Sequence, residues 1–530
     1  MSHTQGSEQS ELIDDPLFLT IDNGTQSIRA LLFDKTGNLV AKSKIELTPY
    51  FSSQPGYAEQ DPAYYWSSLC NACQQLWADN TIDKHRIVAM AVTTQRDTMI
   101  NLNKDGETIR PAILWLDQRV ANELSPMPWY WNTAFKLVGE ASSVNYFRRK
   151  AKANWYQAHE PETWQQTDKF LLLSAWLNYR LTGQFHDSVA NTVGYLPFDY
   201  KKQCWAGKHD WKWSALPVKP DMLPTLFKPG ERLGYVSKSV AEQTGIPANL
   251  PVLAAASDKA CEVLGSGCFD PTTASLSYGT TATVNTNNPA YVEPLPFVPP
   301  YPSAIPDYYN SEVMIYRGFW MVSWFKQEFG LREQQLAKER GVTPESLFDE
   351  LVDKVPPGSM GLMLQPYWSP GLKNQEAKGA ILGFGDVHTR AHIYRAILEG
   401  LAYALREGKE NLEKRQKKKI RRLMVSGGGS QSDAALQLTA DIFNLDVHRP
   451  HTYETSGLGA AINIAVGMGY YEDYHQAAHA MTRIDKTFRP NQSNVQLYNR
   501  LYKEVYKPMY KRLKPIYQTI KDITGYPAEH

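Results

Sequence analysis

Cysteine is scarce in this sequence, with five among 530 residues. An odd number in so long a chain argues against a disulfide framework and favours a reducing compartment, so we expect a cytoplasmic protein. Cys70 and Cys73 have a C-x-x-C spacing, but no second such pair exists and both lie in a pattern typical of one amphipathic helix. We therefore expect core or half-buried thiols rather than a redox or zinc site.

The chain also lacks an excess of charge and a long apolar run. Lys and Arg total 56 against 55 Asp and Glu, a formal charge of +1, so nothing attracts the whole chain to nucleic acid or an anionic membrane. No apolar run approaches the roughly 20 residues of a membrane-spanning helix. We expect neither kind of partner, and interpret the basic run 415–422 as cations at a helix C-terminus.

With 42% hydrophobic and 21% charged residues, the chain is globular and long enough for two to four domains or two large ones. Residues 1–16 are polar and have no apolar segment. We expect them to form a disordered tail.

Two apolar runs, 17–21 and 30–33, flank the polar sequence DNGTQSIR. They predict a β-hairpin whose tip, Asn23 and Gly24, tolerates positive φ, and the run 39–47 predicts a third strand that completes a three-stranded meander. Backbone donors, hydroxyls and an Arg around the carboxylate of Asp22 are what a polyphosphate with a divalent cation requires. Many Asp-Asn-Gly hairpins bind nothing, so a purely structural turn stays equally open.

Polar residues follow two further predicted strands. Strand 86–93 precedes Arg96 and Asp97, and strand 112–116 precedes Asp117. Polar residues beyond strand C-termini form the binding crevice of α/β sheets, which makes these three side chains site candidates. A solvated loop is the equally weighted alternative.

The opening architecture recurs from about residue 251. Strand 252–256 is followed by a helix from Asp258 to Gly265, and then by a hairpin with the small, hydroxyl-rich tip 279–281. This recurrence predicts two similar halves that face each other across a cleft.

A strand ending at Ser426 runs into three glycines and then a helix through Phe443. Such turns let a ligand approach the backbone and expose helix N-terminal N–H groups to anions. The pattern is neither Gly-x-Gly-x-x-Gly nor a P-loop. For Gly457 and Gly459 we predict close packing, and for 495–523 one or two covering helices.

In order, these pieces resemble the FGGY carbohydrate kinases, which include glycerol kinase, xylulokinase and ribulokinase. The likeness covers nearly the whole chain and looks like a branch with no substrate that we can name. It rests on segments 22–29, 56–62, 94–97, 115–119, 258–260, 278–280, 379–383, 392–400 and the triple glycine.

The resemblance implies an α/β, two-domain ribonuclease H-like fold of the actin/hexokinase type, with an ATP cleft between the domains. The first domain, 17–250, would bind the acceptor and carry the first phosphate loop. The second, 251–490, would carry the catalytic Asp, the second phosphate loop and the adenosine site, and residues 491–530 would form covering helices.

The resemblance also implies ATP-dependent phosphorylation of a hydroxyl of a small sugar, pentulose-like ketose or polyol, with ATP and Mg²⁺ as cofactors. Asp258 would be the general base and, with Asp22, would hold the metal. The other implied contacts are Thr25, Gln26, Ser27, Arg29, Gly279 and Thr280 for the phosphates, Gly318, Gly428 and Ser432 for the adenosine, and Arg96, Asp97, Tyr146, Asp258 and Lys259 for the acceptor.

Departures from the family bear on the substrate. Glycerol kinase has Gln after its catalytic Asp, whereas Lys259 adds a cation here. Asp97 is one methylene shorter than the matching Glu of glycerol kinase, and the Met-His pair of xylulokinases is absent. Glycerol is therefore not the first choice, although Lys259 could instead pair with Glu262.

Two other functions stay open, an actin- or Hsp70-like nucleotide switch and a sugar-binding regulator that has lost catalysis. A switch does not need Arg96, Asp97, Tyr146 and Asp258 together, and the presence of both Asp22 and Asp258 disfavours the regulator. We expect a small-molecule partner, and a homodimer is left open.

Overall fold

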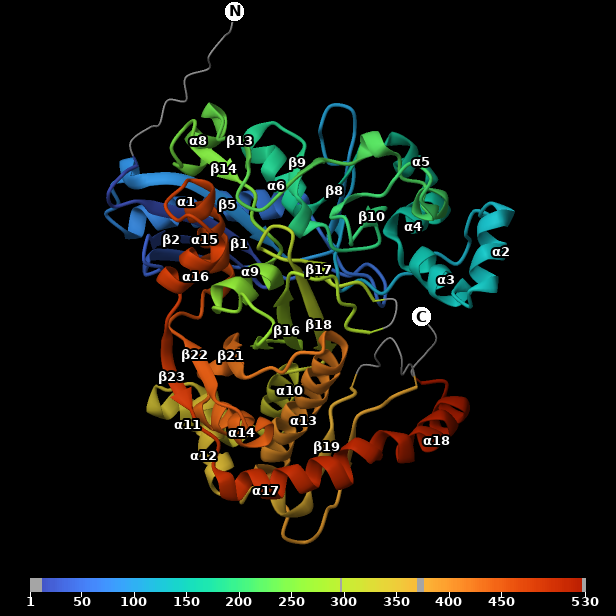
Figure 1. Ribbon diagram of the computed structural model, residues 1–530, viewed down its shortest axis with the longest axis vertical. Coiled ribbons are helices and arrows are strands. Elements are labelled where there is room, and N and C mark those ends of the chain that lie inside the picture. Colours follow the sequence, from blue (N-terminus) through green and yellow to red (C-terminus); the bar gives the residue numbers. More distant parts are fainter. Residues whose placement is uncertain (1–11, 296–297, 369–375, 527–530) are drawn as a thin grey trace, which may run out of the picture. The chain divides into compact units, whose positions relative to one another are not determined.

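The computed structural model describes residues 12–295, 298–368 and 376–526 (Figure 1). These residues form two compact units. The first comprises residues up to Asp199 with Gln203–Cys261 and Ser456–Met481, and the second comprises Tyr200–Lys202, Glu262–Thr455 and the chain from Thr482. Most of the tail predicted to be disordered, residues 1–11, lies outside the described residues.

A six-stranded sheet of order β13-β14-β5-β1-β2-β3 forms the centre of the first unit. The predicted meander at the N-terminus is confirmed, since β1, β2 and β3 pair antiparallel. Strands β5 and β14 lie parallel to β1, and β13 closes the edge antiparallel. The strands are β1 Leu17–Asn23, β2 Ser27–Asp34, β3 Leu39–Glu46, β5 Ile87–Thr94, β13 Arg232–Tyr235 and β14 Pro251–Leu253.

Both faces of this sheet are covered, and for that reason β1 is buried along its whole length. On one face Leu19 and Leu32 pack with Leu69 of helix α1 (Pro62–Asp79). On the other face helix α15 (Thr455–Gly467) lies so close that a Cβ on Gly457 would be 2.2 Å from Leu31. Figure 1 shows α15 beside β1 and β2. The predicted close packing of Gly457 is confirmed.

The remaining elements of the first unit include a four-stranded sheet of order β4-β7-β6-β8. The elements are β4 Glu59–Gln60, β6 Met99–Leu102, β7 Ala112–Ile113, β8 Lys169–Leu172, β9 His186–Ser188, β10 Phe198–Asp199, β11 Cys204–Trp205, β12 Thr225–Phe227, α2 Trp129–Leu137, α3 Ala141–Lys150, α4 Lys152–His159, α5 Pro161–Gln166, α6 Leu173–Thr182, α7 Trp211–Ala215, α8 Lys238–Thr244 and α16 Tyr474–Met481.

The second unit repeats the strand arrangement of the first in a sheet of order β17-β18-β16-β15-β21-β22-β23. Strands β15, β16 and β18 are antiparallel, β21 and β22 continue parallel to β15, and β23 is antiparallel. The predicted recurrence of the architecture is confirmed. The strands are β15 Thr273–Tyr278, β16 Ala282–Asn288, β17 Tyr301–Pro302, β18 Tyr309–Ile315, β21 Arg422–Ser426, β22 Val447–Pro450 and β23 Ile484–Phe488.

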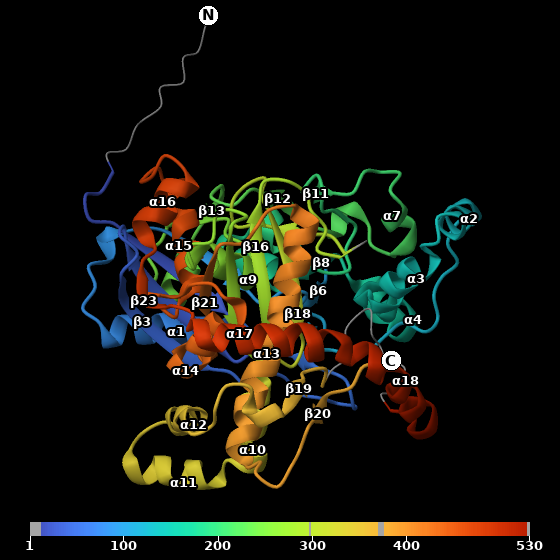
Figure 2. The same cartoon turned by 60° about the horizontal axis from the view of Figure 1, so that its bottom comes forward.

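Helix α13 (Arg390–Gln416) runs through the core of the second unit (Figure 2). The predicted basic helix end is confirmed, because α13 ends one residue before Lys417. The predicted covering helices at the C-terminus are also present, as α17 and α18. The other elements are α10 Trp320–Phe329, α11 Leu331–Arg340, α12 Pro344–Asp353, α14 Asp433–Phe443, α17 Gln492–Arg500, α18 Lys507–Thr524, β19 Met363–Gln365 and β20 Ala380–Leu382, while α9 Asp258–Gly265 joins the two units.

Some sequence predictions differ from the structure. Segment 112–116 is not a strand of the main sheet, because β7 turns back and pairs antiparallel with β4 and β6. Residues 251–261 and 456–481, assigned by sequence to the second domain, belong to the first compact unit, since β14 pairs with β5 and α15 packs on β2.

Cys70 and Cys73 are buried in α1, as predicted. None of the helices in the described ranges is long and apolar enough to cross a membrane.

Candidate active site

The connection between β1 and β2 brings two predicted site residues together. A guanidinium nitrogen of Arg29 lies 3.1 Å from Oδ2 of the buried Asp22. The turn is closed by a hydrogen bond of 3.0 Å from the backbone N–H of Gly24 to the carbonyl of Ser27. The predicted hairpin is confirmed, but neither Asn23 nor Gly24 uses the positive φ that it tolerates. The connection has three residues instead of two, so it does not need the left-handed conformation.

The hydroxyl of Thr25 has a determined orientation. It donates to Oε1 of Gln95 (2.9 Å) and accepts from Nε1 of Trp115 (2.9 Å). Gln95 in turn donates to the hydroxyl of the buried Tyr65 (3.0 Å). This chain of bonds fixes the first predicted phosphate loop on its supporting sheet. The carbonyl of Gln26, the next residue, accepts from the backbone of Leu47 at 2.8 Å.

Asp258 begins α9 at the sheet edge where Asp22 ends its own strand. Asp22 pairs with Thr93 in the β1–β5 register, and the hydroxyl of Thr93 donates to the carbonyl of Ala256 at 2.8 Å. Burial raises the pKa of the Cys261 thiol to about 12, and the carboxylates of Asp22 and Asp258 both add to that rise. Both carboxylates therefore lie close enough to the Cys261 thiol to act on it, and their roles as metal ligand and base stay predictions.

The backbone N–H of Lys259 donates to Oδ1 of Asp258 at 2.7 Å, so the carboxylate caps the helix that it begins. Glu262, the predicted alternative partner of Lys259, accepts a hydrogen bond of 2.7 Å from the hydroxyl of Ser426. Whether the ammonium group of Lys259 binds an acceptor or a neighbouring carboxylate stays a prediction.

Arg96 and Asp97 follow β5, at the carboxyl edge of the sheet. Asp97 has φ 49°, a left-handed conformation that turns the loop out of the strand. Its Oδ2 lies 2.8 Å from Nζ of Lys152. Burial raises the pKa of Asp97, while the charges of Lys152 and Arg96 lower it. The side chain of Asp97 is thus ion-paired and only 23% exposed, and its role at an acceptor site stays a prediction.

Tyr146 on α3 approaches the same loop through the segment Gly194–Tyr195. A Cβ on Gly194 would lie 2.7 Å from Oδ1 of Asp97, so the backbone touches that carboxylate. The rings of Tyr146 and Tyr195 have centroids 6.5 Å apart. The structure therefore gathers Tyr146, Arg96 and Asp97 in one region of the first unit.

Asp117, the third strand-end candidate, is a structural residue. Its carboxylate accepts a 2.7 Å hydrogen bond from the backbone of Ala58, pairs with Arg119 at 2.7 Å, and is 1% exposed. The guanidinium of Arg119 also lies over the ring of Tyr57. Because both oxygens have protein partners, Asp117 holds the segment 56–58 in place and offers nothing to a ligand.

In the second unit the tip of the β15–β16 hairpin bonds to the segment before α10. The backbone N–H groups of Gly318 and Phe319 donate to the carbonyls of Thr280 and Gly279, both at 3.0 Å. A Cβ on Gly318 would lie 2.1 Å from the backbone nitrogen of Ala282, so only glycine fits. Gly279, Thr280 and Gly318 are thus brought together, as predicted.

The triple glycine reaches the same place through aromatic packing. Gly427, with φ 83°, lies against the backbone of Tyr278, and a Cβ on Gly429 would meet the ring of Phe319 at 2.4 Å. The rings of Tyr278 and Phe319 stack with their centroids 4.2 Å apart. A Cβ on Gly428 would meet nothing within 4 Å. The middle glycine alone of the three therefore has an open approach.

Ser432 caps α14, since its hydroxyl accepts from the backbone of Ala435 at 3.0 Å. The same hydroxyl donates to Oδ1 of Asp349 on α12 at 2.6 Å. Beside it is a cavity of about 760 Å³ lined by Asp349, Asp353, Asp433, Ala434, Gln437, Lys486, Thr487, Phe488 and Arg489. The volume is within the range of small-molecule sites.

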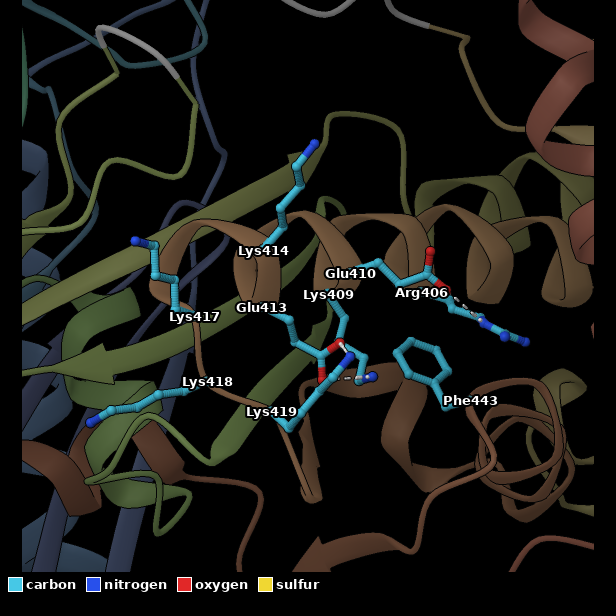
Figure 3. Close-up of a pocket in the computed structure, with 9 residues that line it drawn as sticks. All are labelled: Arg406, Lys409, Glu410, Glu413, Lys414, Lys417, Lys418, Lys419 and Phe443. Carbon is cyan, nitrogen blue, oxygen red and sulfur yellow. Dashed lines mark hydrogen bonds and ion pairs between the residues drawn. The ribbon is translucent and has the colours of Figure 1, made fainter.

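A second cavity, of about 590 Å³, lies at the C-terminal end of α13 and contains no predicted site residue (Figure 3). Three of the six cations that line it have carboxylate partners, because Lys409 and Lys419 share Glu413 and Arg406 pairs with Glu410. Lys414, Lys417 and Lys418 point away from these pairs in Figure 3. Because none of the predicted site residues lines this cavity, we place the chemistry elsewhere.

Sequence reasoning missed Lys152, Lys150 and Asp349. The two lysines lie in a basic stretch of the sequence, but nothing in their spacing relates them to Asp97. Asp349 is 83 residues from Ser432, with no local pattern to connect them.

Two units that repeat one strand order, each with a polar hairpin tip, define a two-domain ribonuclease H-like α/β protein of the actin/hexokinase type. The gluconate kinase structure from Lactobacillus acidophilus shares this fold, with a TM-score of 0.79 at 22% identity over 96% of this chain and 100% of that one.

Residues 17–265 match the N-terminal domain, and residues 274–468 the C-terminal domain, of the FGGY family of carbohydrate kinases. The chain belongs to that family and is an ATP-dependent carbohydrate kinase. It is 32% identical over 480 residues to the uncharacterized sugar kinase YgcE of Escherichia coli, covering 90% of each chain. It is 28% identical to the xylulose kinase of Lactococcus lactis, covering 91% of this chain and 94% of that one.

Proposed function

We propose that this kinase transfers the γ-phosphoryl group of ATP to a primary hydroxyl of a small polyhydroxylated carbohydrate, with Asp258 as the general base. The observation that carries the proposal is the position of Asp258 at the start of α9, on the sheet edge that also holds Asp22, Arg96 and Asp97. A carboxylate there can take the hydroxyl proton as the oxygen attacks phosphorus.

Arg96 and Asp97 would bind the hydroxyls of the acceptor, as a fork of donors and a paired acceptor. Buried polar groups of this kind favour ligands that match them and reject analogues lacking a hydroxyl. Tyr146 would supply a ring face and a further hydroxyl. Burial raises the pKa of Tyr146, so its hydroxyl stays a donor at neutral pH.

The nucleotide would bind at the tip of the β15–β16 hairpin and at the triple glycine, two segments connected by ring packing. The tip residues Gly279 and Thr280 would bind phosphate through N–H groups, and Gly428 would admit the adenosine to the backbone. In the first unit Thr25, Gln26, Ser27 and Arg29 would form the other phosphate loop. Positioning and charge neutralisation are the main requirements of phosphoryl transfer.

Mg²⁺ fits this set of groups as a companion of the nucleotide. The described residues contain no cluster of three or more His, Cys, Asp or Glu side chains that would hold a metal ion by themselves. Magnesium in such enzymes uses one or two carboxylates together with phosphate and water oxygens. Asp22 and Asp258 would supply the carboxylates, and the bound ion would neutralise phosphate charge.

The nucleotide switch and the non-catalytic regulator gain no support. Every relative named above is a kinase, and Arg96, Asp97 and Tyr146 form a polar acceptor region that a switch does not use. A switch would hydrolyse ATP without stimulation by a sugar.

A coupled ADP-release screen tests the proposal. Purified protein with ATP and Mg²⁺ would be offered pentuloses, hexuloses, tetritols, pentitols and glycerol, each against a no-acceptor control. We expect at least one acceptor to raise the ADP-release rate by about 10²-fold or more over that control. Slow hydrolysis that no acceptor stimulates would contradict the proposal.

A further inference from the structure

Lys150, the last residue of α3, lies among the acceptor residues although nothing in the sequence singled it out. It is half-buried. Burial lowers its pKa and Asp117 raises it, with smaller contributions from Arg149, Lys152 and Asp97, so the ammonium group lies near both carboxylates. An ammonium group withdrawn from water needs a compensating anion or acceptor.

Both nearby carboxylates already have cationic partners. Asp97 pairs with Lys152 at 2.8 Å and Asp117 with Arg119 at 2.7 Å. Throughout the described part of the chain, no carboxylate lies within 4 Å of the Lys150 ammonium nitrogen. The charge of Lys150 is therefore not neutralised by an ion pair of its own.

Lys150 also lies on the face of α3 that carries Tyr146. Residues four apart on a helix share a face, so Lys150 and Tyr146 lie one above the other on α3. The ring of Tyr146 meets Tyr195, whose neighbour Gly194 touches Asp97. Lys150 thus adjoins the region proposed for the acceptor.

The electrostatics of this region are unusual for a site that binds a neutral sugar. The charges of Arg96, Lys150 and Lys152 lie near the carboxylate of Asp97, with Asp117 also close, in a chain whose formal charge is only +1. Hydroxyl groups would offset the cost of burying these cations only in part, whereas an anion would form stronger, charge-assisted hydrogen bonds.

We propose that the acceptor is a sugar acid, a polyhydroxy carboxylate whose carboxylate binds Lys150 while its hydroxyls bind Arg96 and Asp97. This inference rests on the proposed function of the same site. A singly charged carboxylate matches the single ammonium group of Lys150, which has no carboxylate of the described residues within 4 Å. A phosphate ester, with nearly two negative charges, would be repelled more strongly by Asp97.

The test compares acids with their neutral counterparts in the ADP-release assay, using gluconate against glucitol and xylonate against xylitol, with ketoses and a sugar phosphate alongside. We expect kcat/KM to be about 10²-fold higher for an acid than for its polyol. Lys150→Met should lower that ratio by about 10-fold or more, mainly through KM, and Lys150→Arg should restore most of it. The matched control is Lys136→Met, on the exposed surface of α2, which should keep the ratio.

Several results would overturn the inference. Higher kcat/KM for a neutral ketose or polyol would reject the acid while leaving the kinase function intact, and preference for the sugar phosphate would reject the carboxylate. A Lys150→Met variant with an unchanged melting temperature and an unchanged acid-to-polyol ratio would remove Lys150 from the site. If no acceptor stimulated ADP release, the proposed function would fail as well.

Discussion

The hydroxyl of Ser432 donates a 2.6 Å hydrogen bond to the carboxyl group of Asp349, 83 residues earlier in the chain. The bond ties the N-terminus of α14 to α12. It orients a residue proposed for the adenosine site, whereas the burial of Asp349 disfavours the charged form of its carboxyl group.

Asp349 should make the stability of the protein depend on pH. Burial raises its pKa to about 6, helped by Asp433 and Asp353 and opposed by the Ser432 hydrogen bond. The ordinary pKa of an Asp carboxyl group is lower. Between about pH 4 and 6 the folded state therefore keeps a proton that the unfolded state has lost. The free energy of unfolding falls as pH rises through this range. Asp349→Asn should therefore raise the free energy of unfolding by about 1 kcal/mol near pH 8, after allowance for partial exposure, and by much less near pH 4.5.

Thermal unfolding of Asp349→Asn and wild type across that range measures the effect. Asp105→Asn, an exposed loop change, is the control and should show no such pH dependence. An effect of equal size at both pH values would show that Asp349 is not protonated in the folded protein.

Gly428→Val tests the adenosine site without disturbing the fold. A Cβ at this position meets nothing within 4 Å, and Gly428 does not have positive φ. The added side chain should therefore obstruct only a ligand, and raise the Kd for ATP by about 10-fold or more while acceptor binding is unchanged. Calorimetry measures the Kd for ATP and the affinity for the acceptor. Gly207→Val, equally open and equally unstrained, should leave the Kd unaltered; unaltered ATP binding by the Gly428 variant would relocate the pocket.

Asp258→Asn tests the general base. The amide cannot accept the hydroxyl proton, so kcat should fall on the order of 10²-fold or more, while the affinity for ATP stays nearly intact. The amide oxygen can still accept the hydrogen bond from the Lys259 backbone, so the start of α9 should be preserved. Turnover close to that of wild type, in steady-state assays with saturating acceptor, would remove Asp258 from the mechanism.

Arg96→Ala tests the acceptor site. Loss of charge-assisted hydrogen bonds should reduce kcat/KM for the acceptor by about 10² or more, whereas slow background hydrolysis of ATP should be unaltered because water needs no such clamp. Arg232→Ala, at an exposed position of β13, is the matched control. If hydrolysis and sugar phosphorylation fell together, Arg96 would belong to the phosphate site or to the fold.

Much of this protein was determined by local sequence. Alternating and continuous apolar runs predicted the meander β1–β3, its recurrence at β15–β16, and the helices that begin at Asp258 and after the triple glycine. These features depend on side-chain period and on turn residues, which are properties of neighbours in the chain. The family resemblance then indicated which of the polar tips carry the chemistry.

Tertiary structure alone decided the electrostatic surroundings of the site. Lys152 neutralises Asp97 although 55 residues separate them, Arg119 satisfies Asp117, and Lys150 is left beside both carboxylates without an ion pair. Segment 112–116 looked like a strand of the main sheet because its residues are apolar, yet β7 lies in a separate antiparallel sheet. Pairing of strands and of charges depends on distances in space between residues remote in sequence, and no local periodicity contains that information.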